Sequence, residues 1–221
     1  MPTPELRQIA PDVHVIEAPQ RFYGLEVGAR MTILSLDEGL LLHSPVAAPP
    51  ALVERLGAPR WALAPNLLHH LYIGPWAERG VEAWAAPGLA RKRADVGFAG
   101  EVVAGVQPFG GAVEVLPMTC FAMTREVALL HRPSGTLIVS DLVFNLSPEA
   151  PWTTRAAMRC LCGYPGCKVT LLERLGMRRE AARREIEHLL SWPFDRLIMA
   201  HGEIVETGGK EALRRAFSWL W

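Results

Sequence analysis

Four apolar stretches of the chain end in polar side chains that could bind a metal or take part in catalysis. The final polar side chains are His43 and Ser44, then Asn66, then Ser140 and Asp141, and lastly His201. A buried strand that ends on a histidine, aspartate or asparagine places that group at a rim of its sheet, and several such strands bring several groups together. We therefore expect these distant segments to assemble one functional site.

Two histidines follow the second stretch, and they widen the choice of ligands. His69 and His70 are adjacent, so on a regular strand or helix they cannot face the same way, but at a turn one of them can point to the rim. Neutral imidazole is the commonest ligand of zinc and related metals. His201, Asp141 and either His70 or His69 would give two nitrogens and one oxygen, at zinc distances of ~2.0–2.2 Å. Such an open site can lower the pKa of bound water to about 7.

A predicted hairpin places a second carboxylate beside Asp141. Residues 132–135 form its loop, so residue 131 faces residue 136 and Glu126 faces Asp141. Directly opposed side chains have Cβ atoms roughly 4.5–5.5 Å apart, and like charges there are destabilising. The pair calls for a cation, a shared proton or a shifted register, and a bound metal would resolve the conflict most directly. His131 would lie roughly 16 Å from Asp141 at about 3.3 Å per residue, so we exclude it from the site.

The spacing of apolar residues predicts a mixed α/β chain. Strands are expected at residues 13–18, 31–36, 40–43, 61–64, 82–86, 112–118, 126–131, 136–144 and 196–200. Helices are expected at residues 51–57, 71–79, 177–192 and 209–220, and residues 147–176 are predicted to be loop and short helix. Because both halves mix strands and helices, we expect one layered α/β/β/α domain over residues 1–221.

Composition and charge limit the classes of function. Of 221 residues, 50% are hydrophobic and 21% charged, which predicts a substantial core. The 23 acidic and 23 basic residues cancel, which argues against a nucleic-acid partner. No apolar run reaches the about 20 residues that cross a bilayer, and the N-terminus lacks the pattern of a signal peptide. We expect a cytoplasmic protein that acts on a small molecule, with no membrane partner.

Three further groups have alternative interpretations. Cys160, Cys162 and Cys167, with Cys120 as a fourth ligand, could hold a structural zinc, but their spacing fits reduced thiols better. The arginines at positions 155–184 are interpreted as a solvated helix face, with an anionic-substrate surface as the alternative. An exposed pair of tryptophans at the C-terminus, Trp219 and Trp221, could mark a homodimer contact.

The sequence resembles the metallo-β-lactamase fold superfamily over nearly its whole length. The resemblance rests on the strand–strand–strand–helix opening, the loop at residues 66–74, Ser140-Asp141 after a hairpin, and Ala200-His201-Gly202. Residues 64–70 with Trp76, and residues 200–217, look like a bacterial subfamily with a degenerate metal motif. The resemblance implies a four-layer αββα sandwich with a metal site at one edge of its two sheets. It also implies a hydrolase of lactams, thioesters, lactones, phosphoesters or nucleic acids that uses one or two metals.

The first metal motif of the superfamily, His-x-His-x-Asp-His, is broken here. In one register its four ligand positions hold Asn66, Leu68, His70 and Leu71; in the next they hold Pro65, Leu67, His69 and His70. The middle histidine is absent, and Thr119-Cys120 lies in its place. By position, the resemblance carries over Asp141 as the bridging carboxylate and His201 as the last ligand.

These observations lead to two main hypotheses. The first is a hydrolase of esters, thioesters or phosphoesters with one metal, zinc before iron or manganese, held by Asp141, His201 and His69 or His70. In it, Asp141, Glu126 and Asn66 are the catalytic candidates, with Glu126 and Asn66 supporting the ligands or polarising the substrate. The second is a metal-free binding or scaffold protein that keeps the fold. A redox or oxygen-handling iron site on the same scaffold is a third hypothesis.

Overall fold

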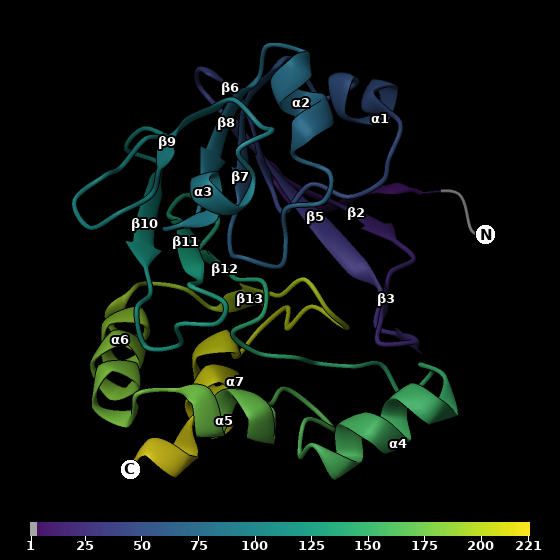
Figure 1. Ribbon diagram of the computed structural model, residues 1–221, viewed down its shortest axis with the longest axis vertical. Coiled ribbons are helices and arrows are strands. Elements are labelled where there is room, and N and C mark those ends of the chain that lie inside the picture. The colour runs from purple at the N-terminus through teal and green to yellow at the C-terminus, as the bar shows by residue number, and fades with distance from the viewer. Residues whose placement is uncertain (1–3) are drawn as a thin grey trace.

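A computed structural model describes residues 4–221 and contains two main β-sheets between layers of helices (Figure 1). The seven-stranded sheet has the order β1-β2-β5-β6-β7-β8-β9. Its strands are β1 (Leu6–Ala10), β2 (Val13–Ala18), β5 (Ala29–Leu36), β6 (Gly39–His43), β7 (Pro59–Ala64), β8 (Glu82–Ala85) and β9 (Phe98–Glu101). The four-stranded sheet consists, in order, of β10 (Val113–Pro117), β11 (Val127–His131), β12 (Thr136–Ile138) and β13 (Arg196–Ile198). A separate hairpin pairs β3 (Arg21–Phe22) with β4 (Leu25–Glu26).

The helices lie outside the two sheets, and most of them cover an outer face of a sheet. They are α1 (Pro50–Glu54), α2 (Gly74–Glu78), α3 (Leu89–Lys92), α4 (Trp152–Cys160), α5 (Leu171–Gly176), α6 (Arg179–Ser191), α7 (Gly209–Ala216) and the 3-10 helix η1 (Ser218–Leu220). Within residues 4–221, no helix is both long enough and apolar enough to cross a membrane.

Alternation of side chains along the strands divides the core into three layers. Leu41 of β6 and Leu129 of β11 belong to the cluster between the sheets. Leu42 points to the other face of its sheet and shares a cluster with Trp76 of α2. Leu130 likewise faces outward and packs with residues of α6 and α7, among them Ile186. The architecture is therefore the expected α/β, four-layer αββα sandwich.

Two pairs of parallel strands position the polar side chains. β6 runs parallel to β7, and β12 runs parallel to β13. His43, Asn66, Asp141 and His201 come at or just after the carboxyl ends of these four strands. The carboxyl ends of parallel strands meet at one edge of a sheet, and the two sheets bring these edges together.

The structure corrects several predicted elements. The strand predicted over residues 136–144 ends at Ile138, because the amides of Ser140 and Asp141 donate to the carboxylate of Glu126 rather than to a neighbouring strand. Residues 147–176, predicted as loop and short helix, contain the nine-residue helix α4 and the six-residue helix α5, with Pro151 at the start of α4 where it breaks no helical hydrogen bond. The predicted helix over residues 71–79 is shortened to α2, and β1, β3, β4, β9 and α3 were not predicted.

Candidate metal centre

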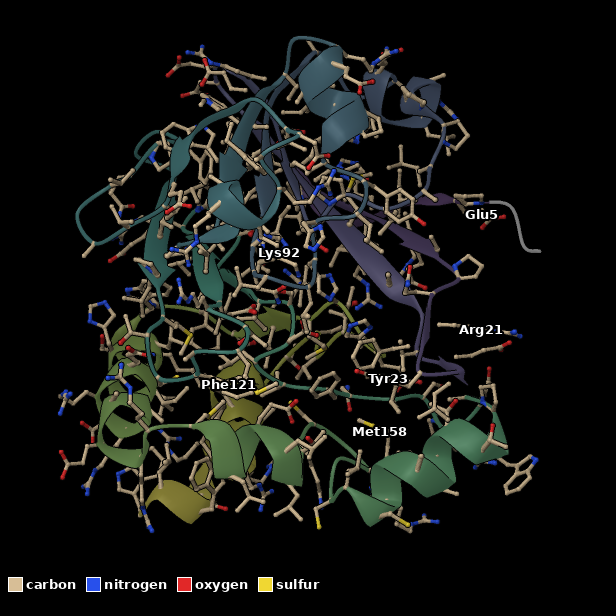
Figure 2. The ribbon with its side chains drawn as sticks, viewed as in Figure 1. Glu5, Arg21, Tyr23, Lys92, Phe121 and Met158 are labelled. Carbon is tan, nitrogen blue, oxygen red and sulfur yellow. The ribbon has the colours of Figure 1, made fainter. Side chains whose placement is uncertain are left out.

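Asn66 joins the ends of the two sheets. It follows β7, it is fully buried, and its side-chain oxygen accepts the backbone N–H groups of Leu68 (2.8 Å) and His69 (2.7 Å). This local turn, which asparagine favours, orients the loop that carries His69. Lys92, visible in Figure 2, secures the same loop by donating to the carbonyl oxygen of Leu67 (2.6 Å).

The amide nitrogen of Asn66 lies between the two carboxylates of the predicted hairpin. It donates to Asp141 Oδ2 (2.7 Å), Glu126 Oε2 (3.0 Å) and Ser140 Oγ (3.0 Å). The register of the hairpin is as predicted, since His131 pairs with Thr136 and Glu126 lies beside Asp141. This amide, which donates to both carboxylates, offsets the repulsion between them. From the sequence, a bound metal had been expected in that role.

Glu126 is held as a buried carboxyl group of altered acidity. Ser140 donates to Glu126 Oε1 through its backbone N–H and through its hydroxyl (2.7 Å). Burial and then the charge of Asp141 raise the pKa of Glu126 to about 7. Asp141 is coupled to it but moves in the opposite direction: burial would raise the pKa of Asp141, yet the neighbouring His69 and His201 hold it well below its usual range.

The other oxygen of Asp141 faces two imidazole rings. His201 Nε2 lies 3.2 Å from Asp141 Oδ1, His69 Nε2 lies 3.4 Å from the same oxygen, and the two Nε2 atoms are 3.1 Å apart. Among residues 4–221, these three are the single group of three or more His, Cys, Asp or Glu residues with ligand atoms close enough to share a metal. We call His69, Asp141 and His201 the triad. Its side chains are 7–11% exposed, so the triad is largely buried.

Each imidazole ring of the triad has a hydrogen-bond partner on its far side, and for His201 this partner directs the Nε2 lone pair inward. His201 Nδ1 lies 2.7 Å from the carbonyl oxygen of Gly28, which can only accept, so Nδ1 carries the hydrogen and Nε2 of the neutral ring carries a lone pair. His69 Nδ1 lies 2.8 Å from the hydroxyl of Ser44, which can accept from Nδ1 or donate to it. When Ser44 accepts, two nitrogen lone pairs and one carboxylate oxygen converge, and such an arrangement requires a proton or a cation at its centre.

The size of the triad fits a tetrahedral metal. Ligand atoms about 2.0–2.1 Å from a tetrahedral zinc are about 3.3 Å apart. The three separations in the triad, 3.1, 3.2 and 3.4 Å, match that edge length. Three protein ligands also leave the fourth position free, which is the arrangement of catalytic rather than structural zinc sites.

The loop that carries His201 is fixed by a buried arginine. Arg30 donates to the carbonyl oxygens of Met199 (2.5 Å) and Gly202, on either side of His201, and forms an ion pair with Glu17 (2.6 Å). Gly202 has a φ of +92°, and a Cβ there would collide with the backbone carbonyl of Asn145. The ring of Phe144 stacks on His201 at 5.7 Å, with an interplanar angle of 12°.

Comparison with known proteins gives a match in structure but none in sequence. No protein-family model and no curated protein matches the sequence. The metallo-β-lactamase from Pontibacter korlensis has a TM-score of 0.67 at 15% identity, with 99% of each chain covered. The metallo-β-lactamase FIM-1 from Pseudomonas aeruginosa, in its mono-zinc form, has a TM-score of 0.68 at 10% identity over 99% of this chain and 96% of that one. The metal-soaked Flv1 flavodiiron core from Synechocystis sp. PCC6803 has a TM-score of 0.68 at 13% identity over 99% of this chain and 61% of that one.

The chain has the metallo-β-lactamase fold. At 10–15% identity, the likeness shows the fold alone. The triad lies where the resemblance in sequence implied a metal site, at the edge where the two sheets of this metallo-β-lactamase fold meet.

Several side chains considered from the sequence lie away from the triad. His70 turns towards Arg93, with Nδ1 3.0 Å from Nη1 of that arginine, so of the two adjacent histidines the structure brings only His69 to Asp141 and His201. His43 is buried between the sheets without a partner for Nε2, and burial together with the nearby His69 lowers the pKa of His43 to about 3. His131 pairs with Ser134, at the opposite end of the hairpin.

The cysteines form no candidate zinc site in the described part of the chain. Cys160 and Cys162 are exposed, Cys167 is half-buried and Cys120 is buried, and none belongs to a metal-sized group. Burial raises the pKa of the Cys167 thiol to about 11, which disfavours the thiolate that a metal needs.

Three groups that support the triad were not identified from the sequence. Ser44 ends one of the four apolar stretches, so the sequence marked its position as a candidate. The sequence did not indicate that Ser44 contacts His69. Gly28 and Arg30 gave no signal, because they contact His201 and its loop across more than 160 residues of chain.

Proposed function

We propose that this protein is a hydrolase that uses one divalent metal, held by His69, Asp141 and His201. The observation that carries the proposal is the convergence of three potential ligand atoms at 3.1–3.4 Å, with both Nδ1 atoms bonded elsewhere. When bound, a divalent metal supplies Lewis-acid chemistry that makes water acidic near neutral pH. Zinc is the first candidate because imidazole and carboxylate ligands in a tetrahedral set suit it, with iron and manganese as alternatives.

A single metal is proposed because Asp141 has only one free oxygen. Oδ1 faces the histidines, whereas Oδ2 accepts a hydrogen bond from Asn66 (2.7 Å). A second metal that shared Asp141 would have to displace the Asn66 amide, whose carbonyl oxygen is also engaged by two backbone N–H groups.

Asn66 and Glu126 are proposed to act as positioning residues. Glu126 is buried behind Asp141, and its oxygens are occupied by Ser140 and Asn66, so it supports the ligand carboxylate from behind. The two hydroxyls that contact this network, Ser44 on His69 and Ser140 on Glu126, are both fully buried, so neither is placed to attack a substrate. Water is therefore the proposed attacking group, and an ester, thioester or phosphoester of a small molecule is the proposed substrate.

One observation supports a metal-free alternative. Burial would lower the pKa of His69, but the charge of Asp141 and a hydrogen bond to it raise that pKa. The single Nε2–H of a protonated His69 could then be shared between Asp141 and His201 and hold the triad without a metal. In that case the protein would be a binding or scaffold protein on a metallo-β-lactamase fold.

Metal analysis separates the two proposals. Protein purified without chelator should contain about one equivalent of zinc, iron or manganese per chain by elemental analysis, and its melting temperature should rise on metal addition. His69→Ala and His201→Ala should each lose the metal, whereas the matched control His70→Ala should retain it. Less than one equivalent after dialysis, with melting unchanged by zinc, manganese or iron, would establish the metal-free protein.

The hydrolase itself is tested with chromogenic esters, thioesters and phosphoesters. Wild-type protein should hydrolyse at least one class, lose that activity with a chelator and regain it with one metal. Stoichiometric metal without hydrolysis of any class would contradict the proposed chemistry but not the metal site.

A further inference from the structure

One end of the molecule exposes large apolar side chains. Figure 1 shows α4, α5 and the C-terminus along the lower border of the view. These segments carry Trp152, Leu171, Leu172, Leu175 and Trp221, of which Trp152 and Leu175 are more than 70% exposed. Phe121, labelled in Figure 2, packs against Gly176 and anchors the end of α5 from inside, so the leucines are left facing solvent. Leu171, Leu172 and Leu175 share the short helix α5, and an exposed apolar group of this kind marks an interaction site more often than a chance exposure.

The same end carries positive charge that has no acidic partner. Residues 152–179 contain one acidic residue and six basic ones: Arg155, Arg159, Lys168, Arg174, Arg178 and Arg179. The whole chain is neutral, so the segment carries a net charge of +5 against −5 on the remainder. Across residues 4–221, none of the six forms a salt bridge, whereas 11 of the other 17 lysines and arginines do.

The contacts of these side chains leave their charge uncompensated. Arg174, Arg178 and Arg179 donate to backbone carbonyl oxygens, and Arg159 lies over the ring of Tyr164. Carbonyl oxygens and an aromatic face satisfy hydrogen bonds but do not neutralise a guanidinium group. Glu173, the lone acid of the segment, accepts a hydrogen bond from Thr170 at the start of α5 instead of pairing with an arginine.

We propose that this end of the molecule, which we call the basic end, docks on an anionic lipid bilayer. Leucines and tryptophans enter the boundary between headgroups and acyl chains, while arginines attract anionic headgroups. A second copy of the chain would bring like charges together in a symmetric dimer, and a nucleic acid would leave the leucines exposed. The helices are too short to span a bilayer, so the protein lies on the surface. The sequence-based expectation of no membrane partner considered spanning segments alone.

The basic end is connected to the triad. Lys168 and Phe144 exchange two backbone hydrogen bonds (2.8 and 2.9 Å), and the ring of Phe144 stacks on His201. Docking would therefore hold the candidate metal centre close to the lipid surface. The docking proposal does not depend on metal binding or hydrolysis.

Sedimentation with vesicles tests the proposal on the full chain. Vesicles of phosphatidylcholine with phosphatidylserine should bind the wild type at low salt and release it in high salt, while pure phosphatidylcholine should bind it weakly. Arg178→Gln with Arg179→Gln should lower the partition coefficient roughly 30-fold, which is about 1 kcal/mol per arginine. Arg55→Gln with Arg91→Gln, exposed and unpaired residues outside the basic end, should change it less than twofold.

A second variant tests the apolar part. Leu172→Ser with Leu175→Ser alters exposed positions only, so the fold should be kept and binding to anionic vesicles should fall about tenfold. Absence of binding to anionic vesicles at low salt, or an equal loss in the Arg55 and Arg91 control, overturns the proposal. So does a concentration-dependent dimer that the leucine variant abolishes, or nucleic-acid binding that the leucine variant leaves intact.

Discussion

The two oxygens of Asp141 belong to two different polar environments. On the Oδ2 side, the Asn66 amide donates to both carboxylates and to Ser140, and Ser140 donates in turn to Glu126. On the Oδ1 side, the Nε2 atoms of His69 and His201 lie 3.4 and 3.2 Å from the carboxylate oxygen. We call the first side the amide network; the second is the triad.

The difference shows which buried polar groups can be part of a functional site. In the amide network, every donor has an acceptor, so the network is complete without any ligand. In the triad, two acceptors, Nε2 of a neutral His201 and Oδ1 of Asp141, face one another, and a buried pair of that kind is costly unless a proton or metal lies between them. Equal burial and equal closeness of charged groups therefore do not identify a site; the match of donors to acceptors does.

Removing the Asn66 side chain should have the largest effect, because the amide network depends on it. Asn66→Ala leaves two buried carboxylates without their shared donor, and we expect a loss of about 4 kcal/mol in unfolding free energy. Urea denaturation in chelator-containing buffer measures this without a contribution from metal. Asn145→Ala, which removes a single surface hydrogen bond to the carbonyl of Glu203, is the control and should cost about 1 kcal/mol. A loss below 2 kcal/mol for Asn66→Ala would show that the two buried carboxylates do not depend on the Asn66 amide.

The charge of Glu126 should make the amide network sensitive to pH. Its pKa is raised from about 4.5 in the unfolded chain to about 7, so the folded state binds the proton more tightly. Glu126 therefore contributes up to about 3 kcal/mol to the unfolding free energy. This contribution is fully present below about pH 4.5 and is lost as the pH rises through 7. Glu126→Gln should remove that loss. The pKa of His43 is lowered to about 3 in the folded protein, so the unfolded chain binds the proton more tightly. His43 therefore lowers the unfolding free energy as the pH falls, which is the opposite of the effect of Glu126.

The test is the difference in unfolding free energy between the wild type and Glu126→Gln, measured by urea denaturation from pH 4 to 8 without metal. If the two unfolding free energies changed in parallel over that range, the carboxyl group of Glu126 would not be the titrating group.

The hydroxyl of Ser44 should have a smaller effect, confined to the triad. Ser44→Ala removes the partner of His69 Nδ1, so metal affinity should fall roughly 10–100-fold, while the stability of the metal-free protein should change little. Competition with a chromophoric chelator measures the affinity. Ser134→Ala is a matched control, since Ser134 forms the same kind of bond with His131 outside the site (2.7 Å). Equal affinity in the two variants would mean that Ser44 does not orient the ligand.

Much of the site was predictable because strand ends and hairpin loops are local signals. The positions of Asp141 and His201 followed from apolar strands that end on polar residues, and the nearness of Glu126 to Asp141 followed from counting along the hairpin. The choice between His69 and His70 did not follow. It depends on the turn that Asn66 makes with its own loop and on Ser44, which reaches that loop from β6.

The sequence by itself determined the layered α/β architecture and the strand ends that approach one another, because alternation of apolar residues and the position of turns are properties of neighbouring residues. The tertiary structure decided which polar atoms meet. Asn66, Glu126 and Asp141 come from both sheets, and Gly28 and Arg30 contact the His201 loop from the far end of the chain. A hydrogen bond depends on distances of a few tenths of an ångström and on direction, which only the packed sheets fix.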